Sequence, residues 1–216
     1  MRKKMCRLLF VKSNDRVNLK QHLEFFAAIC RNSREYQGHG WGLAFIRDGK
    51  WKIYRSILPI WEDDLSVFGS SSYIIAHARS AFRDEDIDVK NNMPFYYKRH
   101  VFIFNGELRG VRLRSEGRTG AEKLFHFIKR LDRGDILEAM NRGVELIQRR
   151  SEFIRGMNFI IGDGKRIYLN SFFSEDEEYF TMHLRRENGA LIVCSEPYPG
   201  QGKWHKINNH TMEVME

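Results

Sequence analysis

The chain has 216 residues, of which 42% are hydrophobic and 30% charged, proportions that suit a protein with a substantial buried core. Its net charge is +8, but the 36 basic residues are spread along the chain among 28 acidic ones. We therefore expect no nucleic-acid partner, and no membrane partner because no apolar run approaches ~20 residues. Three cysteines without a CxxC motif argue against a disulfide framework and predict a cytoplasmic location.

The first half of the chain carries mainly strand signals around one helix. Leu19, Leu23 and Phe26 recur at helical spacing and predict an amphipathic helix. Asp48-Gly49 is the dipeptide that a type I′ turn requires, and it lies between two apolar runs that predict a hairpin. The expected elements are a strand over 6–12, a helix over 17–30, and strands over 41–46, 51–57, 72–79 and 101–104.

The second half begins with two helices and returns to strands. Thr119 is a suitable N-cap, and Glu122 three residues later completes a capping box. Asp-Gly and Asn-Gly pairs mark tight turns between the later apolar runs. The expected elements are helices over 119–131 and 135–150, and strands over 157–162, 166–172, 179–186, 190–195 and 211–215.

Strands, then two helices, then an antiparallel meander do not make an alternating βα chain. This order favours an α+β layered fold with antiparallel sheets. Four prolines and 17 scattered glycines leave no flexible linker, so we expect one domain over residues 1–216. The eight histidines show no HExxH motif and no paired Cys/His spacing, so neither a metal nor another cofactor is expected.

Four segments, taken in order, resemble the class II glutamine amidotransferases of the N-terminal-nucleophile (Ntn) hydrolase superfamily, and the small stand-alone members most closely. They are residues 5–9 (MCRLL), 39–44 (HGWGLA), 76–79 (AHAR) and 104–108 (FNGEL). Further matches lie at residues 92–95 (NMPF), 119–123 (TGAEK) and 195–197 (SEP). The resemblance covers essentially the whole chain. It implies a four-layer αββα sandwich with two antiparallel sheets, and release of ammonia from the side-chain amide of glutamine.

The resemblance also implies the catalytic groups. Cys6 would be the nucleophile, with its own α-amino group, of pKa near ~8, as the base. The thiolate would attack the amide carbon and form a thioester, which water then hydrolyses. Asn105, through its side-chain N–H, and Gly106, through its backbone N–H, would form the oxyanion hole. Taken alone, Cys6 would better fit a buried structural cysteine, and Asn105-Gly106 an ordinary Asn-Gly turn; the accompanying motifs favour the catalytic roles.

Arg79 is the residue that the resemblance assigns to the α-carboxylate of the substrate, through a two-pronged guanidinium contact. A strand-end arginine in a surface ion pair is the alternative. His77 and Trp41 are the accompanying substrate-site candidates, and both also fit core positions. Cys30 and Cys194 are expected in the core.

Gly120 departs from the family pattern. Many members have an aspartate at the matching position, in a Ser-Asp-Thr-Glu-like motif that binds the α-ammonium of the substrate, whereas this chain reads TGAE at 119–122. The loss of such a charge-assisted hydrogen bond weakens binding of free glutamine roughly ten- to a hundredfold. The substrate could then be glutamine, another γ-glutamyl amide or a peptide-like amide.

Residues 1–5 are the second departure, because the mechanism needs a free amine on Cys6. Met1 before Arg2 is expected to be retained, so translation starts at Met5, or a short propeptide is cut after Met5, or Cys6 is never exposed. The leading hypothesis is a glutaminase-type amide hydrolase or amidotransferase, with a separate synthetase chain as a possible ammonia acceptor. The alternative is a catalytically inactive regulatory or binding module of the same fold.

Overall fold

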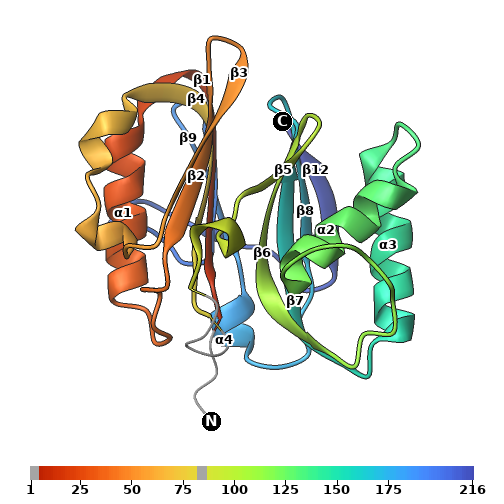
Figure 1. The fold of residues 1–216 in the computed structure, drawn as a ribbon. Helices are drawn as coiled ribbons and strands as arrows, with labels where there is room; N and C mark the ends of the chain where they lie inside the picture. The colour runs from red at the N-terminus through yellow and green to blue at the C-terminus, as the bar shows by residue number, and fades with distance from the viewer. Residues whose placement is uncertain (1–4, 82–86) are drawn as a thin grey trace.

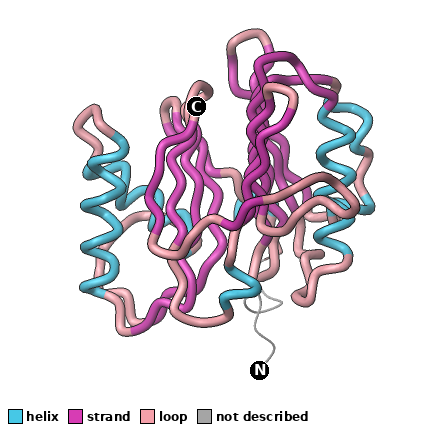
Figure 2. The backbone as a smooth tube through the Cα atoms, turned by 180° about the vertical axis from the view of Figure 1, so that it is seen from behind, coloured by secondary structure: helices cyan, strands magenta, loops and turns pink. Residues whose placement is uncertain are grey.

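Two antiparallel sheets face each other, and helices cover the outer face of each. The computed structural model describes residues 5–81 and 87–216. Figure 1 shows the resulting order of layers, with helix α1 (Leu19–Arg31) on one side and helices α2 (Gly120–Leu131) and α3 (Ile136–Arg150) on the other. The same four layers are seen from behind in Figure 2. The αββα sandwich expected from the motifs is therefore confirmed.

The first sheet has seven strands, and β1 lies at its centre. Its order is β11 (His205–Lys206), β9 (His183–Glu187), β10 (Ala190–Cys194), β1 (Arg7–Asn18), β4 (Ser70–Ala78), β2 (Trp41–Arg47) and β3 (Lys50–Ser56). Strand β1 pairs with β4 on one side and β10 on the other, so the first and last thirds of the chain meet there.

The second sheet has five strands. Its order is β12 (Thr211–Met215), β8 (Ile167–Ser171), β7 (Phe153–Gly162), β6 (His100–Arg109) and β5 (Phe95–Tyr97). Strand β5 pairs only with residues 100–102 of β6. The rest of that edge of β6 therefore has no strand beside it among the described residues, and a wide loop leads from it to α2 (Figure 1).

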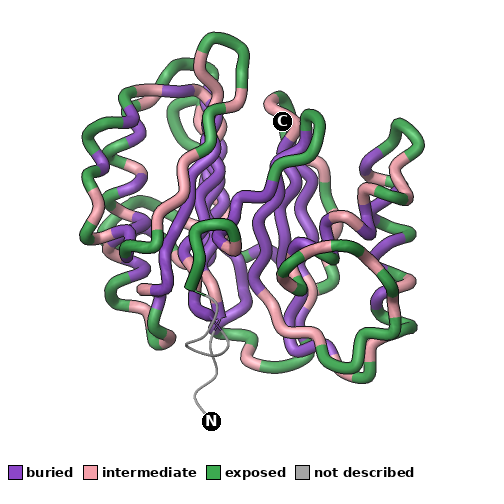
Figure 3. The backbone as a smooth tube through the Cα atoms, viewed as in Figure 1, coloured by how far each residue is buried: buried purple, intermediate pink, exposed green. Residues whose placement is uncertain are grey.

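Apolar side chains fill the spaces between the layers, and the strands are the most buried part of the molecule (Figure 3). One core lies between the first sheet and α1. The short 3-10 helices η1 (Ile60–Glu62) and η2 (Leu65–Phe68) also contribute side chains to it. A larger core joins the two sheets and continues under α2 and α3. Burial of this area is the main stabilising contribution to such a fold. Within the described part of the chain, no helix is both long and apolar enough to span a bilayer.

Local signals predicted most elements correctly. The β2–β3 hairpin turns at Asp48 and Gly49 with φ of 53° and 69°, as a type I′ turn requires. Thr119 caps α2 by accepting a hydrogen bond from the Glu122 N–H at 3.1 Å. The Glu122 carboxylate, however, accepts from the Arg118 N–H at 2.7 Å and not from Thr119, so the capping box reaches one residue further back.

The expected strand over 179–186 was wrong at its start. Residues Glu177–Phe180 form the short helix α4, and the strand begins only at His183. Tyr179 and Phe180 pack with Met5 and Phe173 in a small separate core, which fixes the helical turn. The short strands β5 and β11 and the 3-10 helix η3 (Val89–Asn91) were not anticipated.

Candidate active site

Cys6 immediately precedes β1 and faces the space between the two sheets. Along β1, Leu9 and Val11 pack toward α1, whereas Leu8 and Phe10 belong to the core that joins the sheets. Side chains alternate between the faces of a strand. Cys6, two residues before Leu8, therefore has its thiol on the inter-sheet side.

The Cys6 thiol lies against the backbone that follows β4. Its Sγ accepts a hydrogen bond from the Ser80 N–H at 3.4 Å and lies 3.8 Å from the Ser80 carbonyl oxygen. Burial raises the pKa of Cys6 to about 11, an effect that the Ser80 N–H and the charges of Arg79 and Arg7 offset only in part. The thiol is therefore protonated at neutral pH, and it needs a nearby base before it can attack.

A pocket of about 590 Å³ opens beside this thiol. Cys6 and Ser80 line it from the first sheet, Gly106 from β6, and Gly120 from the start of α2. Three residues that are far apart in sequence and were singled out by the motifs thus lie on one pocket. The Ser80 hydroxyl is buried there without a hydrogen-bond partner among the described residues, and a ligand could supply one.

Asn105 faces the inter-sheet space from the second sheet. Phe102, on the opposite face of β6, stacks on Phe125 of α2 at 4.9 Å between ring centroids. Because side chains alternate along a strand, Asn105, three residues further on, points toward the first sheet. Asn105 is buried, and its side-chain oxygen has no partner within the described chain. The residue does not itself line the pocket, although Gly106 beside it does.

His77 lies on the inter-sheet face of β4, and Arg79, two residues later, comes directly after the end of this strand. His77 is fully buried, and burial, followed by the charge of Arg79, lowers its pKa to about 3, so the imidazole is neutral. Arg79 is half-buried, and its Nη1 donates to Asn92 Oδ1 at 3.2 Å. Neither side chain lines the pocket.

Trp41 lies on the other face of the first sheet, away from the pocket. It packs with Phe68 and Tyr54 in the core under α1, and its indole N–H donates to Asp63 Oδ2 at 2.8 Å. This position agrees with the core alternative, so we leave Trp41 out of the candidate site. Cys30 and Cys194 are in the same core, as expected.

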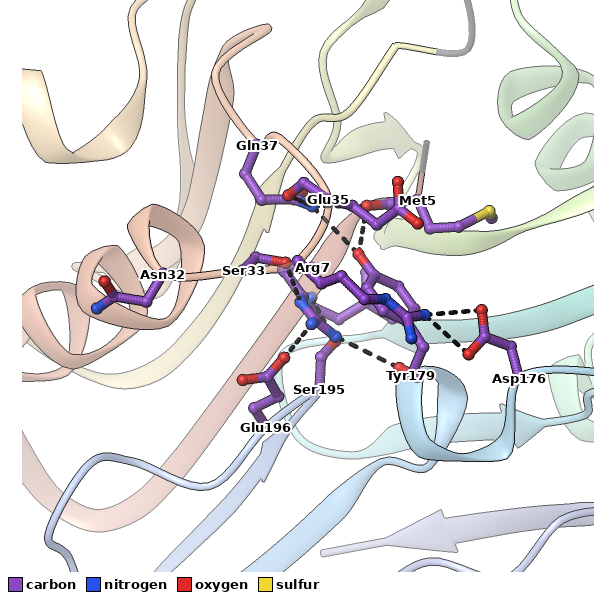
Figure 4. Close-up of polar contacts among 12 residues, drawn as sticks. Met5, Arg7, Asn32, Ser33, Glu35, Gln37, Asp176, Tyr179, Ser195 and Glu196 are labelled. Carbon is purple, nitrogen blue, oxygen red and sulfur yellow. Dashed lines mark hydrogen bonds and ion pairs between the residues drawn. The ribbon is translucent and has the colours of Figure 1, made fainter. Parts of the chain in front are cut away.

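Two residues that the motifs did not single out hold the peptide before Cys6. Gln37 Nε2 and Tyr179 Oη each donate to the Met5 carbonyl oxygen at 2.6 Å. Figure 4 shows both side chains converging on this carbonyl. Met5 is only 3% exposed, and the Gln37 side-chain oxygen has no partner among the described residues. We call Gln37 and Tyr179 the Met5 clamp.

Arg7 packs against Tyr179, one of the two residues of the Met5 clamp. Its guanidinium carbon lies 3.9 Å from the centre of the Tyr179 ring, and its Nε donates to Ser33 Oγ at 3.2 Å. It also forms an ion pair with Glu196 (Figure 4). A charged residue inside the apolar start of β1 was the one sequence signal for this network, because a buried arginine needs acidic or aromatic partners.

The Cys6 nitrogen is part of the Met5–Cys6 peptide bond in this structure. It is therefore not the free amine that the expected mechanism uses. Residues 1–4 of the expected leader lie outside the described residues.

Comparisons with known proteins identify the fold. No family model and no curated relative matches the sequence. Among solved structures, a glutamine aminotransferase class-II domain protein from Silicibacter pomeroyi is 18% identical, with a TM-score of 0.64, 97% of this chain covered and 94% of that one. A predicted glutamine amidotransferase from Pseudomonas aeruginosa is 15% identical, with a TM-score of 0.60 and coverages of 97% and 96%.

The glutamine phosphoribosylpyrophosphate amidotransferase of B. subtilis, solved with ADP and GMP, is 14% identical with a TM-score of 0.65. The match covers 88% of this chain but only 42% of that enzyme. This protein therefore has the fold of class II glutamine amidotransferase domains, and the expected resemblance is confirmed at the level of the fold. At these identities the residue roles do not transfer with the fold.

Proposed function

We propose that the protein is a glutaminase-type amide hydrolase or amidotransferase with Cys6 as its nucleophile. The observation that carries the proposal is the pocket beside the Cys6 thiol, which Gly106 and Gly120 line from two other elements. The bond cleaved is a carboxamide, with glutamine and related γ-glutamyl amides as the first substrates to test, and an ammonia-acceptor synthetase chain and a cytoplasmic location belong to the same proposal.

The reaction proceeds through a thioester. In a chain that begins at Cys6, the α-amino group takes the thiol proton and the sulfur attacks the amide carbon. Asn105 and Gly106 donate hydrogen bonds to the oxyanion, and the C–N bond breaks as the nitrogen takes the proton and leaves as ammonia. Water then cleaves the C–S bond, giving the acid and the free thiol. Arg79 contributes positive charge beside the sulfur.

The test uses protein made with a removable extension so that Cys6 is the first residue. Ammonia release from glutamine and from γ-glutamyl amides is measured with this protein, with Cys6→Ala and with the matched Cys30→Ala variant. We expect activity that Cys6→Ala abolishes and Cys30→Ala retains. Activity that survives Cys6→Ala would remove this thiol from the mechanism.

The alternative is an inactive regulatory or binding module, and the Met5 clamp favours it. A buried Met5 whose carbonyl accepts two hydrogen bonds of 2.6 Å blocks the amine of Cys6. The intact mass of the native protein discriminates between the two functions. A chain that begins at Cys6 supports the enzyme, and a chain that retains Met5 supports the inactive module.

A further inference from the structure

The pocket beside Cys6 continues away from the thiol as an apolar chamber between the free edge of β6 and helix α2. Its walls are formed mainly by Phe104, Leu108, Leu113, Leu124, Phe127 and Ile147. The whole pocket, with the thiol end included, has a volume of about 590 Å³, within the ~300–1,000 Å³ of pockets that enclose drug-sized ligands. We call this part of the pocket the apolar chamber.

The charged residues of the pocket do not suit the ammonium group of an amino acid. Among the described lining residues the one acid is Glu107, against the cations Arg109 and Lys123, a balance of 2 − 1 = +1. Glu107 is already engaged, since Oε1 accepts from Arg109 Nε at 2.6 Å and Oε2 lies 3.8 Å from Arg155 Nη1. An ammonium group would therefore enter without a free carboxylate to pair with among the described lining residues, which is unfavourable.

Gly120 leaves open the place where an acid would be expected. It is the first residue of α2 and lines the pocket. A Cβ added there would meet no atom within 4 Å, so the position has room for a side chain that the sequence does not provide. The absence of a side chain at Gly120 and the apolar walls formed by the described residues are separate observations, and both disfavour an α-amino acid in this pocket.

We propose that the substrate of the Cys6 site is an amide of an apolar carboxylic acid, with the hydrocarbon chain of its acyl group in the apolar chamber. This inference rests on the proposed amide-cleaving function. The sulfur bonds to the acyl carbon, the C–N bond breaks, and the nitrogen leaves with the thiol proton as ammonia or an amine. Water then breaks the C–S bond, releasing the apolar acid and restoring the thiol.

The experiment compares glutamine with butanamide, hexanamide and octanamide, using protein that begins at Cys6. Ammonia release gives kcat/KM, and intact mass shows the acyl group on Cys6. Each further buried methylene should raise kcat/KM about fourfold until the chamber is full, and octanamide should exceed glutamine. A preference for glutamine with no dependence on chain length overturns this inference alone. No turnover and no acyl adduct with any amide overturns the proposed function as well.

Two variants and one matched control test which parts of the pocket set the substrate preference. Phe127→Leu enlarges the chamber and should change the chain length at which kcat/KM stops rising. The matched control is Phe125→Leu, a core position on the same helix that does not line the pocket, and it should leave the chain-length profile unchanged. Gly120→Asp should raise kcat/KM for glutamine relative to hexanamide by about 10- to 100-fold. Failure of Phe127→Leu to alter the profile would overturn the assignment.

Discussion

The reactivity of the Cys6 thiol should change in a defined way when the chain begins at Cys6. With Met5 attached, burial raises the pKa of Cys6 to about 11, against ~8.5 for a free cysteine. At pH 7.5 this lowers the thiolate fraction about 300-fold, and the stronger nucleophilicity of the more basic thiolate recovers about 13-fold. Alkylation should therefore be about 20-fold slower than for a free cysteine, with a rate that rises about tenfold per pH unit to above pH 10.

A free α-amino group on Cys6 changes the alkylation rate both below and above the pKa of that amine. Its pKa is near ~8, so below that pH the ammonium charge stabilises the thiolate beside it. Above that pH the neutral amine accepts the thiol proton. We expect an inflection near pH ~8 and a rate at pH 7.5 at least about tenfold higher than in the chain that retains Met5.

The assay follows iodoacetamide addition by intact mass from pH 6 to 10.5 in both proteins. Cys30 and Cys194 are at most 1% exposed, and burial raises the pKa of Cys194 to about 12 and that of Cys30 well above its usual range. Labelling in the first phase should therefore be confined to Cys6 and absent from Cys6→Ser. Identical slopes through pH 8 in the two proteins would refute the amine as the base.

Three further predictions concern the oxyanion hole, the Met5 clamp and the buried histidines. Asn105→Ala should lower kcat by ~10²–10³ with little change in KM, because a donor to the oxyanion acts in the transition state; an unchanged kcat would exclude Asn105 from the hole. Tyr179→Phe should reduce the free energy of unfolding by about 1 kcal/mol more in the chain that retains Met5 than in the chain that begins at Cys6, and equal losses in urea denaturation would show that the clamp does not hold Met5. Burial lowers the pKa of His77 to about 3 and that of His100 to about 4, against ~6.5 in the unfolded chain. As the pH falls below ~6.5, the unfolded state therefore binds protons before the folded state does, and the free energy of unfolding decreases until the folded-state pKa values are reached. The two residues together should cost about 3 kcal/mol between pH 6.5 and 5. His77→Asn should reduce this slope and the exposed His205→Asn should not, whereas a flat profile in the parent protein would contradict the lowered pKa values.

Local chemistry in the sequence determined most of the helices and turns. Thr119 caps α2 through a side-chain hydrogen bond to the first turn, as its position before an apolar helical pattern predicts, and Asp135, the first residue of the second expected helix, caps α3 in the same way. Asp48-Gly49 closes its hairpin because both residues tolerate positive φ. These features depend on a few neighbouring residues, and they can therefore be predicted from the sequence without knowledge of the fold.

Tertiary structure decided which strands pair and which face of each strand reaches the pocket. The last third of the chain has the apolar pattern of a meander, yet β7, β8 and β12 join one sheet and β9, β10 and β11 join the other. Short apolar strands have similar patterns, so the choice of partner depends on the packing of the whole core. For the same reason Trp41, in register with Ala78 of β4, points toward α1 and away from the inter-sheet face.

The ordered motifs by themselves selected Cys6, Gly106 and Gly120, and the fold brings these three to one pocket. Only the fold could place the Met5 clamp, because Tyr179 is 174 residues from Met5 and belongs to a helix that the apolar pattern had predicted as a strand. The apolar chamber likewise requires the free edge of β6 and the face of α2 together. A sequence records which chemical groups are present, whereas contacts between distant segments are fixed by the cooperative packing that buries them.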